Sequence, residues 1–371
     1  MGKIKIGIDA WYLARPYSSI GKMLKNTLRY FSEFMDKYNA EIVLFGNDNP
    51  YIKSYSHQFK IVIIPTQNTM KFYWYLTKLA KKENLDIFFF PFDIAPFYSY
   101  KYVVMVHDLR FAHIISSIKD LVFSFMVKRA VEKANKIITP SYFTKKEIIA
   151  RYRVNAKRIQ TIHLGIDPIF KRIPPEEAMS KVTNLSILTP KVLEKGFILH
   201  VGRIRPKYKN ISTLLRAYIK YKNEINMYLV IVSSDIPSSE DRKIIDKHKD
   251  YIIYLRNIPD EILVLLYNLS DFCIYPSIYE GFPVSLLEAL GCEKPIIASN
   301  ILPHREALGD AGLFFNPFSI EELCEAMIKL SIDYSLKSRL STKAGERAKI
   351  FSWESFSDKL LKTLISAIEE G

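Results

Sequence analysis

Apolar runs of strand length alternate with longer segments of helical periodicity along the whole chain, and this alternation limits the fold more than any other feature. It predicts an α/β protein whose sheets are mostly parallel. Strands are predicted at residues 4–8, 41–46, 61–64, 86–90, 102–107, 136–140, 197–201, 227–232, 252–255, 272–276, 295–299 and 313–315. Helices are predicted at residues 21–38, 70–84, 121–134, 144–151, 212–222, 260–269, 284–291 and 320–331.

The two halves contain similar successions of these units, so we expect two doubly wound, Rossmann-like domains that face each other across a cleft. Between them, Asp167-Pro168 and Pro174-Pro175 precede an unpatterned polar stretch, which is typical of a domain boundary. The expected domains are residues 1–185 and 186–352. Residues 353–371 predict an amphipathic helix, and its broad apolar face needs a partner surface.

The net charge of +14 comes entirely from the first half. Residues 1–185 contain 29 Lys and Arg against 15 Asp and Glu, whereas residues 186–371 contain 24 of each. This asymmetry favours an anionic partner, such as a phosphorylated acceptor, acidic lipid headgroups or nucleic acid. A lysine-rich solvated surface explains the same numbers, so composition leaves both interpretations open.

The cysteine content and the apolar segments indicate the cellular compartment in which the protein is expected. Three cysteines without a CxxC pair support neither a disulfide framework nor a structural zinc site. The start of the chain has no export signal, and the most apolar stretch, residues 87–97, falls short of the roughly 20 residues that a spanning helix needs. We therefore expect a cytoplasmic protein that does not cross a membrane but can lie on its cytoplasmic face.

The segment after the predicted strand at 272–276 is the first place where chemistry is expected. It contains Glu280-Gly-Phe-Pro-Val284 at the start of a predicted helix and Glu288 inside that helix. Free N–H groups at a helix N-terminus bind phosphate, and carboxylates accept hydrogen bonds from sugar hydroxyls. The alternative is one glutamate stabilised by the helix dipole and a second one that is solvated.

Another polar loop, His200-Val-Gly202-Arg203 to Lys209-Asn210, also lies between a predicted strand and a helix. Gly202 allows a sharp turn, and the fork of Arg203 with the point charge of Lys209 can hold a diphosphate. The carboxyl ends of parallel strands lie at one sheet edge, so this loop and the Glu280 loop open onto the same place. Four cations in residues 203–209 are also typical of a solvated loop.

In the first half, His107-Asp108 closes a predicted strand, and Gly21 lies in the sequence after the first strand. A histidine at a strand end can donate to a substrate oxygen or transfer a proton. A histidine that only packs or caps explains His107 equally well.

Together these segments resemble the retaining glycosyltransferases of family 4, which have the GT-B fold of two Rossmann-like domains. The resemblance covers nearly the whole chain and implies that the C-terminal helix crosses back onto the first domain. It rests on Gly7-Ile-Asp9-Ala, His107-Asp108-Leu, Ile138-Thr-Pro140-Ser141, Leu164-Gly-Ile-Asp167, Gly202-Arg203 with Lys209-Asn210, Glu280-Gly-Phe-Pro with Glu288-Ala-Leu, Pro295-Ile-Ile-Ala-Ser, and Arg305-Glu306 with Gly309-Asp-Ala-Gly312.

The resemblance also implies roles for these residues. Arg203 and Lys209 would neutralise the diphosphate of a nucleotide-sugar, and Glu288 would hold the ribose hydroxyls. Glu280 would face the donor sugar, and His107 would approach that sugar from the other domain. The other implied substrate contacts are Gly21, Asp108, Gly202, Gly281, Phe282, Pro283 and Val284.

The implied reaction transfers a hexose with retention of configuration, by front-face attack in which the leaving phosphate helps to deprotonate the acceptor. Arg, Lys and helix N-termini can stabilise a leaving diphosphate, and the sequence has no Asp-x-Asp motif, so neither a metal nor another cofactor is expected. The opening residues and His107-Asp108-Leu look most like the mannosyltransferase branch, which favours GDP-mannose as donor.

The implied acceptor is a glycan or a lipid-linked sugar, as in polysaccharide biosynthesis, and no nucleic acid is expected. The aromatic and basic residues of 70–82 favour contact with an anionic membrane, although an aromatic stripe at helical spacing also suits a core. Two other classes remain: a GT-B sugar-nucleotide epimerase, and a basic protein without activity that binds membranes or nucleic acid. A dinucleotide-dependent oxidoreductase is disfavoured, because Ile8-Asp-Ala-Trp11 lacks the Gly-x-Gly-x-x-Gly turn.

Overall fold

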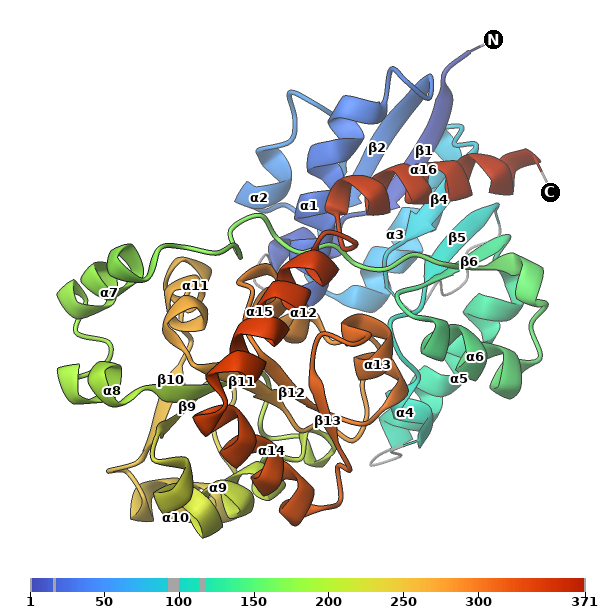
Figure 1. The fold of residues 1–371 in the computed structure, drawn as a ribbon. Helices are drawn as coiled ribbons and strands as arrows, with labels where there is room; N and C mark the ends of the chain where they lie inside the picture. The colour runs from blue at the N-terminus through green and yellow to red at the C-terminus, as the bar shows by residue number, and fades with distance from the viewer. Residues whose placement is uncertain (1, 16–17, 93–99, 114–117, 370–371) are drawn as a thin grey trace. The chain divides into compact units, whose positions relative to one another are not determined.

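The computed structural model describes residues 2–15, 18–92, 100–113 and 118–369. The chain forms two compact units: Met1–Gly165 with Ser352–Gly371, and Ile166–Phe351. Each unit is built on one parallel sheet with helices around it (Figure 1). The α/β class and the parallel sheets are as the sequence predicts.

In the first unit, the described residues form a seven-stranded sheet with the order β3-β2-β1-β4-β5-β6-β7. Its strands are β1 (Ile4–Asp9), β2 (Ala40–Gly46), β3 (Lys60–Ile63), β4 (Ile87–Phe90), β5 (Tyr102–Met105), β6 (Lys136–Thr139) and β7 (Ile159–Thr161). Its helices are η1 (Trp11–Ala14), α1 (Ser19–Phe34), α2 (Pro50–Lys53), α3 (Thr69–Lys82), α4 (Arg110–His113), α5 (Ile118–Lys133), α6 (Tyr142–Tyr152), η2 (Ala156–Arg158) and α16 (Trp353–Glu369).

The second unit has a six-stranded sheet with the order β10-β9-β8-β11-β12-β13. Its strands are β8 (Phe197–Val201), β9 (Tyr228–Ser233), β10 (Ile252–Arg256), β11 (Phe272–Tyr275), β12 (Ile296–Ser299) and β13 (Leu313–Phe315). Its helices are α7 (Pro175–Asn184), α8 (Pro190–Lys195), η3 (Lys207–Lys209), α9 (Ile211–Ile225), α10 (Ser239–Lys247), α11 (Asp260–Leu269), α12 (Val284–Gly291), α13 (Leu302–Leu308), α14 (Ile320–Ile332) and α15 (Tyr334–Ala348).

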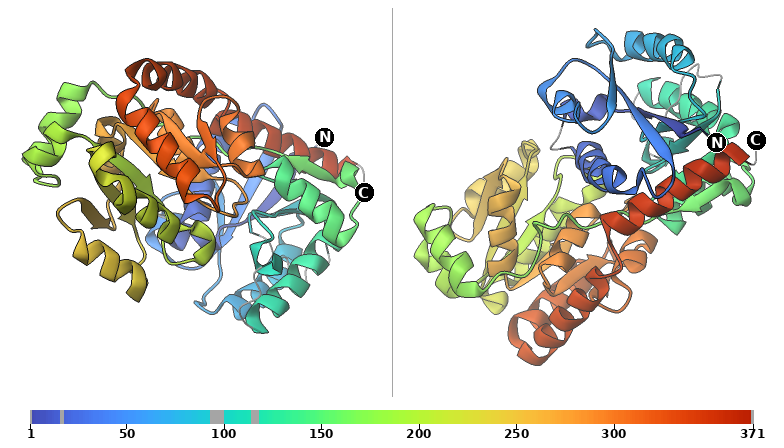
Figure 2. Two further views of the ribbon diagram at one scale, coloured as in Figure 1. Left: turned by 60° about the horizontal axis from the view of Figure 1, so that its bottom comes forward. Right: turned by 90° about the horizontal axis from the view of Figure 1, so that it is seen from above.

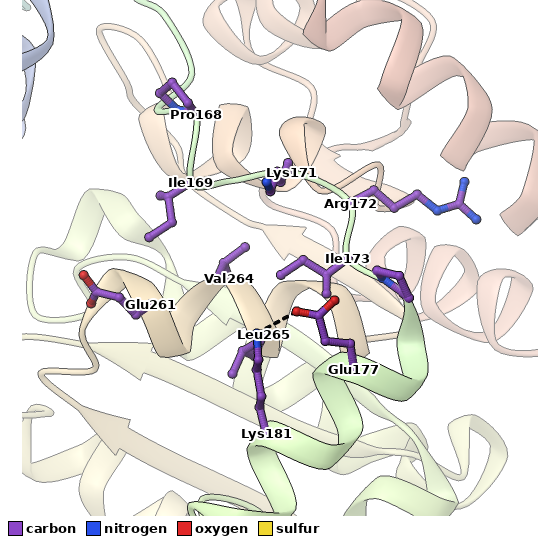
Figure 3. A pocket seen from close by; sticks show the side chains of 11 residues that line it. Pro168, Ile169, Lys171, Arg172, Ile173, Glu177, Lys181, Glu261, Val264 and Leu265 are labelled. Carbon is purple, nitrogen blue, oxygen red and sulfur yellow. Dashed lines mark hydrogen bonds and ion pairs between the residues drawn. The ribbon is translucent and has the colours of Figure 1, made fainter. Parts of the chain in front are cut away.

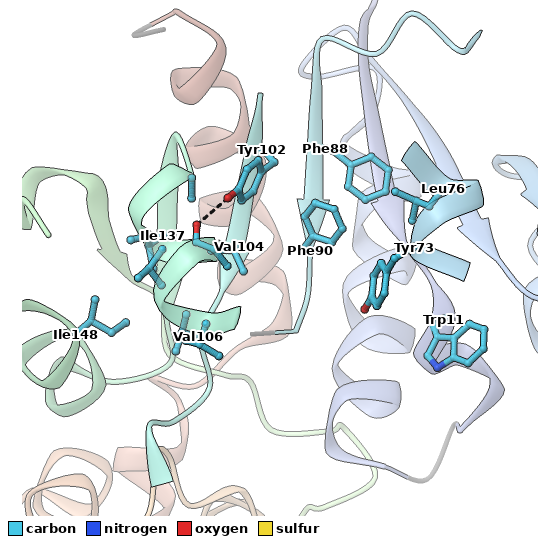
Figure 4. Packing of buried hydrophobic residues seen from close by; sticks show 14 of the residues in the cluster. Trp11, Tyr73, Leu76, Phe88, Phe90, Tyr102, Val104, Val106, Ile137 and Ile148 are labelled. Carbon is cyan, nitrogen blue, oxygen red and sulfur yellow. Dashed lines mark hydrogen bonds between the residues drawn. The ribbon is translucent and has the colours of Figure 1, made fainter. Parts of the chain in front are cut away.

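Both strand orders start in the middle of the sheet, grow to one side and then cross to the other, as in doubly wound dinucleotide-binding folds. Central strands of such sheets are buried on both faces, which is why they appear in the sequence as continuous apolar runs. Figure 4 shows the result in the first unit, where Phe88 and Phe90 of β4 pack with Tyr73 and Trp11.

The C-terminal helix belongs to the first unit, as the resemblance implies. α16 packs along α1 and near β4, β5 and β6, and Figure 2 shows it among the N-terminal elements. Its apolar face is buried through Phe356, Leu360 and Leu364. Asp358 also accepts hydrogen bonds from Lys37 at 2.8 Å and from Tyr38. The last two residues of the predicted helix, 370 and 371, lie outside the described residues.

Residues 166–185 lie with the second unit in the structure, whereas the sequence placed them in the first domain. The stretch that appeared unpatterned is the helix α7, so its interpretation as irregular sequence was wrong. Pro175 occupies the first position of α7, acidic residues fill its first turn, and Ala178 and Val182 are buried. α7 packs against α11, which explains why this segment follows the second unit.

A buried carboxyl group ends the first strand. Asp9 is 1% exposed, and its carboxyl oxygens accept hydrogen bonds from the Trp11 N–H at 2.9 Å and from the Tyr73 hydroxyl at 3.2 Å. Burial outweighs these two bonds and raises its pKa from 3.8 to about 7. Over this pH range the folded chain holds a proton that the unfolded chain has released, so the contribution of Asp9 to stability falls as pH rises.

We expect Asp9→Asn to remove this pH dependence. The amide oxygen can still accept from Trp11, and the amide N–H can donate to the Tyr73 oxygen. The difference in melting temperature between the variant and the wild type should therefore shift in favour of the variant between pH 4 and pH 8, as followed by thermal unfolding. A constant difference over this range would contradict the assignment.

Candidate active site

The carboxyl ends of β8 and β11 form the switch point of the second sheet, where open α/β sheets bind ligands. Two loops meet there, because the Ile278 N–H donates to the carbonyl of Tyr208 at 2.7 Å. Asn210, in a left-handed conformation, fixes the first loop by donating to the carbonyls of Pro276 at 3.0 Å and Pro317 at 2.8 Å. Hydrogen bonds therefore join the two polar loops found in the sequence, the one that follows β8 and the one that follows β11. We call this place the corner.

Lys209 and Glu280 are paired in this corner. The Lys209 ammonium lies 2.6 Å from Glu280 Oε1, and the side chains are 18% and 14% exposed. The Ser277 hydroxyl donates to the same oxygen at 2.7 Å. Burial acts to raise the pKa of Glu280, but the Lys209 charge and the two hydrogen bonds outweigh it, so the net shift is downward. The carboxylate is therefore ionised at neutral pH.

Arg203 lies on the same loop but has a different partner. Its Nε donates to Asp235 at 3.2 Å, and its side chain is 57% exposed. Asp235, which follows β9, also accepts from the N–H groups of Ile204 and Arg205 at 3.2 and 3.1 Å. Arg203 is thus held at the rim beside an acidic residue that the sequence did not single out, and its predicted contact with a diphosphate stays a prediction.

The loop after β11 leads into α12. Pro283, at the N-cap, has no N–H, and among the described residues no side chain caps this helix. Phe282 is 8% exposed and packs against Phe351. Val284 starts the helix, and the N–H groups of Leu286 and Leu287 already donate to the carbonyl of Pro283 at 3.1 and 3.2 Å. In the first turn this leaves the N–H groups of Val284 and Ser285 for an anion. Gly281 and Phe282 lie in the connecting loop, as predicted.

Glu288 lies inside α12 and is 8% exposed. Its Oε2 accepts a hydrogen bond from the Tyr267 hydroxyl at 3.1 Å. Tyr267 comes from α11, and its hydroxyl oxygen also lies 2.9 Å from the carbonyl oxygen of Ser285, the alternative acceptor for its one proton. This arrangement positions the carboxylate, and its contact with ribose stays a prediction.

Two buried histidines, to which the sequence analysis assigns no role, flank the Lys209–Glu280 pair. His200 ends β8 and His304 lies on α13, and they are 2% and 0% exposed. The charges of Lys209 and Glu280 act on both rings, while burial is the main cause that lowers both pKa values to about 4. Both imidazoles are therefore neutral at pH 7.

In the first unit, the predicted residues have local partners. His107 lies after β5, its Nε2 is 2.8 Å from the carbonyl of Pro91, and burial lowers its pKa. Asp108 accepts from the Arg110 N–H at 2.8 Å and so starts α4. Gly21 lies in the first turn of α1, where a Cβ would come 2.2 Å from the carbonyl oxygen of Arg15. Packing therefore requires this glycine, and its role in binding substrate stays a prediction.

A separate cavity of about 500 Å³ lies between residues 168–174, α7 and α11 (Figure 3). Three of its charged residues form ion pairs: Lys181 with Glu177 at 2.6 Å, and Arg172 with Glu293 at 3.0 Å. None of the predicted site residues lines it.

Among the described residues, no group of three or more His, Cys, Asp or Glu side chains is placed to hold one metal ion. No helix in the described part of the chain has the length and apolarity to span a bilayer.

Two doubly wound units, with a lysine, two glutamates and a helix start gathered at the switch point of the second, define a GT-B glycosyltransferase fold. Comparison with known proteins agrees. The family profile "Glycosyltransferase Family 4" matches residues 26–170, and "Glycosyl transferases group 1" matches residues 188–347. The chain belongs to the family 4 glycosyltransferases.

Curated relatives and solved structures are consistent with this assignment. The chain is 30% identical over 230 residues to O-antigen chain mannosyltransferase B of Escherichia coli, covering 61% of this chain and 59% of the relative. It is 27% identical over 216 residues to an O-antigen chain mannosyltransferase of Salmonella typhimurium, covering 58% and 56%. It thus matches less than two thirds of the length of either. Sucrose-phosphate synthase from Thermosynechococcus elongatus shares the fold over 100% of both chains, with a TM-score of 0.78 at 18% identity.

Proposed function

We propose that this protein transfers a hexose, with mannose favoured, from a nucleoside diphosphate sugar to a hydroxyl group of a glycan or lipid-linked acceptor. The observation that carries the proposal is the Lys209–Glu280 pair, with 2.6 Å between ammonium and carboxylate, at the switch point of a doubly wound sheet. The pair places a cation for a leaving diphosphate beside an acceptor for sugar hydroxyls. Both are needed where a glycosyl phosphate bond breaks.

In the proposed reaction, negative charge develops on the diphosphate as its bond to the sugar breaks. Lys209, Arg203 and the first turn of α12 stabilise that charge without a metal. Glu288 accepts hydrogen bonds from the ribose. The leaving phosphate oxygen takes the proton of the acceptor hydroxyl on the same face, so configuration is retained. Gly21, His107, Asp108 and Gly202 stay proposed substrate contacts.

GDP-mannose is the proposed donor, because the two relatives are named as O-antigen chain mannosyltransferases. The test is thermal unfolding with GDP, UDP and ADP and with their common sugar conjugates, each with and without EDTA. A ligand that binds the folded state raises the melting temperature by mass action. We expect one nucleotide to stabilise the protein regardless of EDTA. No shift with any of them, in folded protein, would contradict the proposal and favour a protein without this activity.

Contact with an anionic membrane is proposed for the first unit, which contains 28 Lys and Arg against 16 Asp and Glu in residues 1–165 and 352–371. One face of α5 is buried, whereas its other face exposes a stripe of large apolar side chains. They are Ile118 at 79%, Leu121 at 51%, Val122 at 56% and Phe125 at 65%. Exposed Lys128 and Arg129 continue the same face. An apolar stripe with adjacent cations suits an acidic lipid surface.

The aromatic segment at 70–82 has both buried and exposed side chains. Phe72 and Tyr73 of α3 are buried in the core, while Met70 and Trp74 are 58% and 55% exposed. Lys78 lies 3.7 Å from the centre of the Trp74 ring. α3 therefore adds a second surface of the kind found on α5.

Replacing Leu121 and Phe125 together with serine is expected to lower the fraction bound to phosphatidylglycerol-containing vesicles several-fold in a flotation assay at low salt. The matched control is Ile332→Ser, which removes a 67% exposed apolar side chain from the second unit. Equal flotation of the double variant and the wild type, or binding to neutral vesicles alone, would contradict this role for α5.

A further inference from the structure

The ring of His304 is held in one tautomer by the residues around its Nδ1. This atom lies 3.0 Å from both the carbonyl oxygen and the hydroxyl oxygen of Ser299. The Ser299 hydroxyl donates its own proton to the carbonyl of Ser277. Both neighbours of Nδ1 are therefore acceptors, so Nδ1 carries the proton and Nε2 presents a lone pair.

That lone pair has no partner. Among the described residues, five buried side-chain polar atoms lack a hydrogen bond, and two of them are Nε2 of His304 and Nε2 of His200. An unsatisfied buried polar atom costs free energy. His304 is linked through Ser299 and Ser277 to Glu280, and His200 ends β8, the strand that leads into the Lys209 loop. Because both atoms lie around one ion pair, we infer that a bound molecule, rather than another part of the protein, supplies their hydrogen-bond partners.

His304 is tied to the Glu280 side of this pair. Ser299 connects its ring to Ser277, and the Ser277 hydroxyl donates to Glu280 at 2.7 Å. Nε2 of His200 lies elsewhere, 3.6 Å from where a Cβ of Gly202 would stand, near Ser285 in the first turn of α12. The two histidines therefore belong to different parts of the corner.

The chemistry around His304 selects what can bind there. The His304 lone pair and the Glu280 carboxylate, at the two ends of one hydrogen-bonded chain, are both acceptors, so a phosphate oxygen would be repelled. A metal cation would meet the ammonium of Lys209. A group with several hydroxyl donors, such as a hexose, satisfies both His304 and Glu280.

We propose that His304 Nε2 accepts a hydrogen bond from a hydroxyl of the donor's glycosyl group and so helps to select the sugar that is transferred. This inference rests on the proposed function. It adds a specificity-determining residue that lies outside the motifs found in the sequence.

Two substitutions separate this role from a structural one. His304→Asn keeps an N–H donor at the position of Nδ1 but removes the acceptor, whereas His304→Gln keeps an acceptor at the reach of Nε2. By isothermal titration, we expect His304→Asn to bind GDP-mannose about tenfold more weakly, as for one hydrogen bond, with its affinity for GDP unchanged. His304→Gln should retain most of the affinity for GDP-mannose. His200→Asn is the matched control, since it should change GDP and GDP-mannose binding equally.

If His304→Asn keeps the wild-type ratio of the affinities for GDP and GDP-mannose, the inference is wrong. An internal water would then be the hydrogen-bond partner of Nε2. If neither variant folds, monodeoxy analogues of GDP-mannose provide the test on the wild type: one should bind about tenfold more weakly, and equal affinity for all would overturn the inference. Failure of the wild type to bind any nucleotide or nucleotide-sugar would instead contradict the proposed function itself.

Discussion

Replacing Lys209 with methionine is expected to lower kcat/KM for sugar transfer at least about a hundredfold, the usual cost of losing one donor to a developing anion. Methionine fills similar space but cannot neutralise the departing diphosphate. The change also leaves Glu280 buried without its cation at 2.6 Å, which adds a penalty for the remaining charge. The measurement is the initial rate of nucleoside diphosphate release with saturating acceptor.

Lys207→Met is the matched control, because Lys207 is exposed in the same short helix, η3. We expect it to retain wild-type activity. Lys209→Met combined with Glu280→Gln should be less than additive, since the two side chains form one pair. Near-normal activity of Lys209→Met, in folded protein, would remove Lys209 from the reaction.

The second large effect is expected for Glu288→Gln, which should weaken nucleoside diphosphate binding about tenfold to a hundredfold. Hydrogen bonds to a charged group contribute about 1.5–3 kcal/mol, and the amide is uncharged and has one acceptor oxygen where the carboxylate has two. The Tyr267 hydroxyl can still donate to the amide oxygen, so the site should stay folded. Thermal unfolding with increasing nucleotide measures the loss.

Glu293→Gln serves as the control for this variant. Glu293 follows the same helix and pairs with Arg172 at 3.0 Å, away from the predicted site, so nucleotide binding should not change. Equal affinity of Glu288→Gln and the wild type for the nucleotide would show that Glu288 only supports Tyr267.

Most of the fold could be predicted from the sequence, because buried parallel strands appear as continuous apolar runs and their helices carry a clear period. Several of the elements that were missed are short or mainly polar. β7 is three residues long, and α7 begins with a proline and carries few apolar residues. α15 buries Leu336, Leu340 and Ala344 among mainly polar neighbours.

The site was predictable in its residue types but not in its partners. Lys209 and Glu280 came from loops that follow strands, and their common sheet edge follows from topology. Their direct contact joins residues 71 positions apart, which no local pattern encodes. The pairing of Arg203 with Asp235 is equally non-local. His304 lies outside the motifs. Its proposed contact with the donor sugar depends on its tautomer and its burial, which only the folded structure shows.

The most direct test of the proposed reaction is proton NMR of GDP-mannose incubated with the enzyme, without acceptor and then with a mannosylated glycan, in the presence of EDTA. We predict release of GDP, with the sugar appearing first as the α-anomer or as an α-mannoside, and release by Lys209→Met that is slower by about a hundredfold or more. Appearance of the β-anomer first would contradict retention. Conversion to another nucleotide-sugar would indicate an epimerase, and an unchanged donor, also when UDP- and ADP-sugars are tried, would contradict the account as a whole.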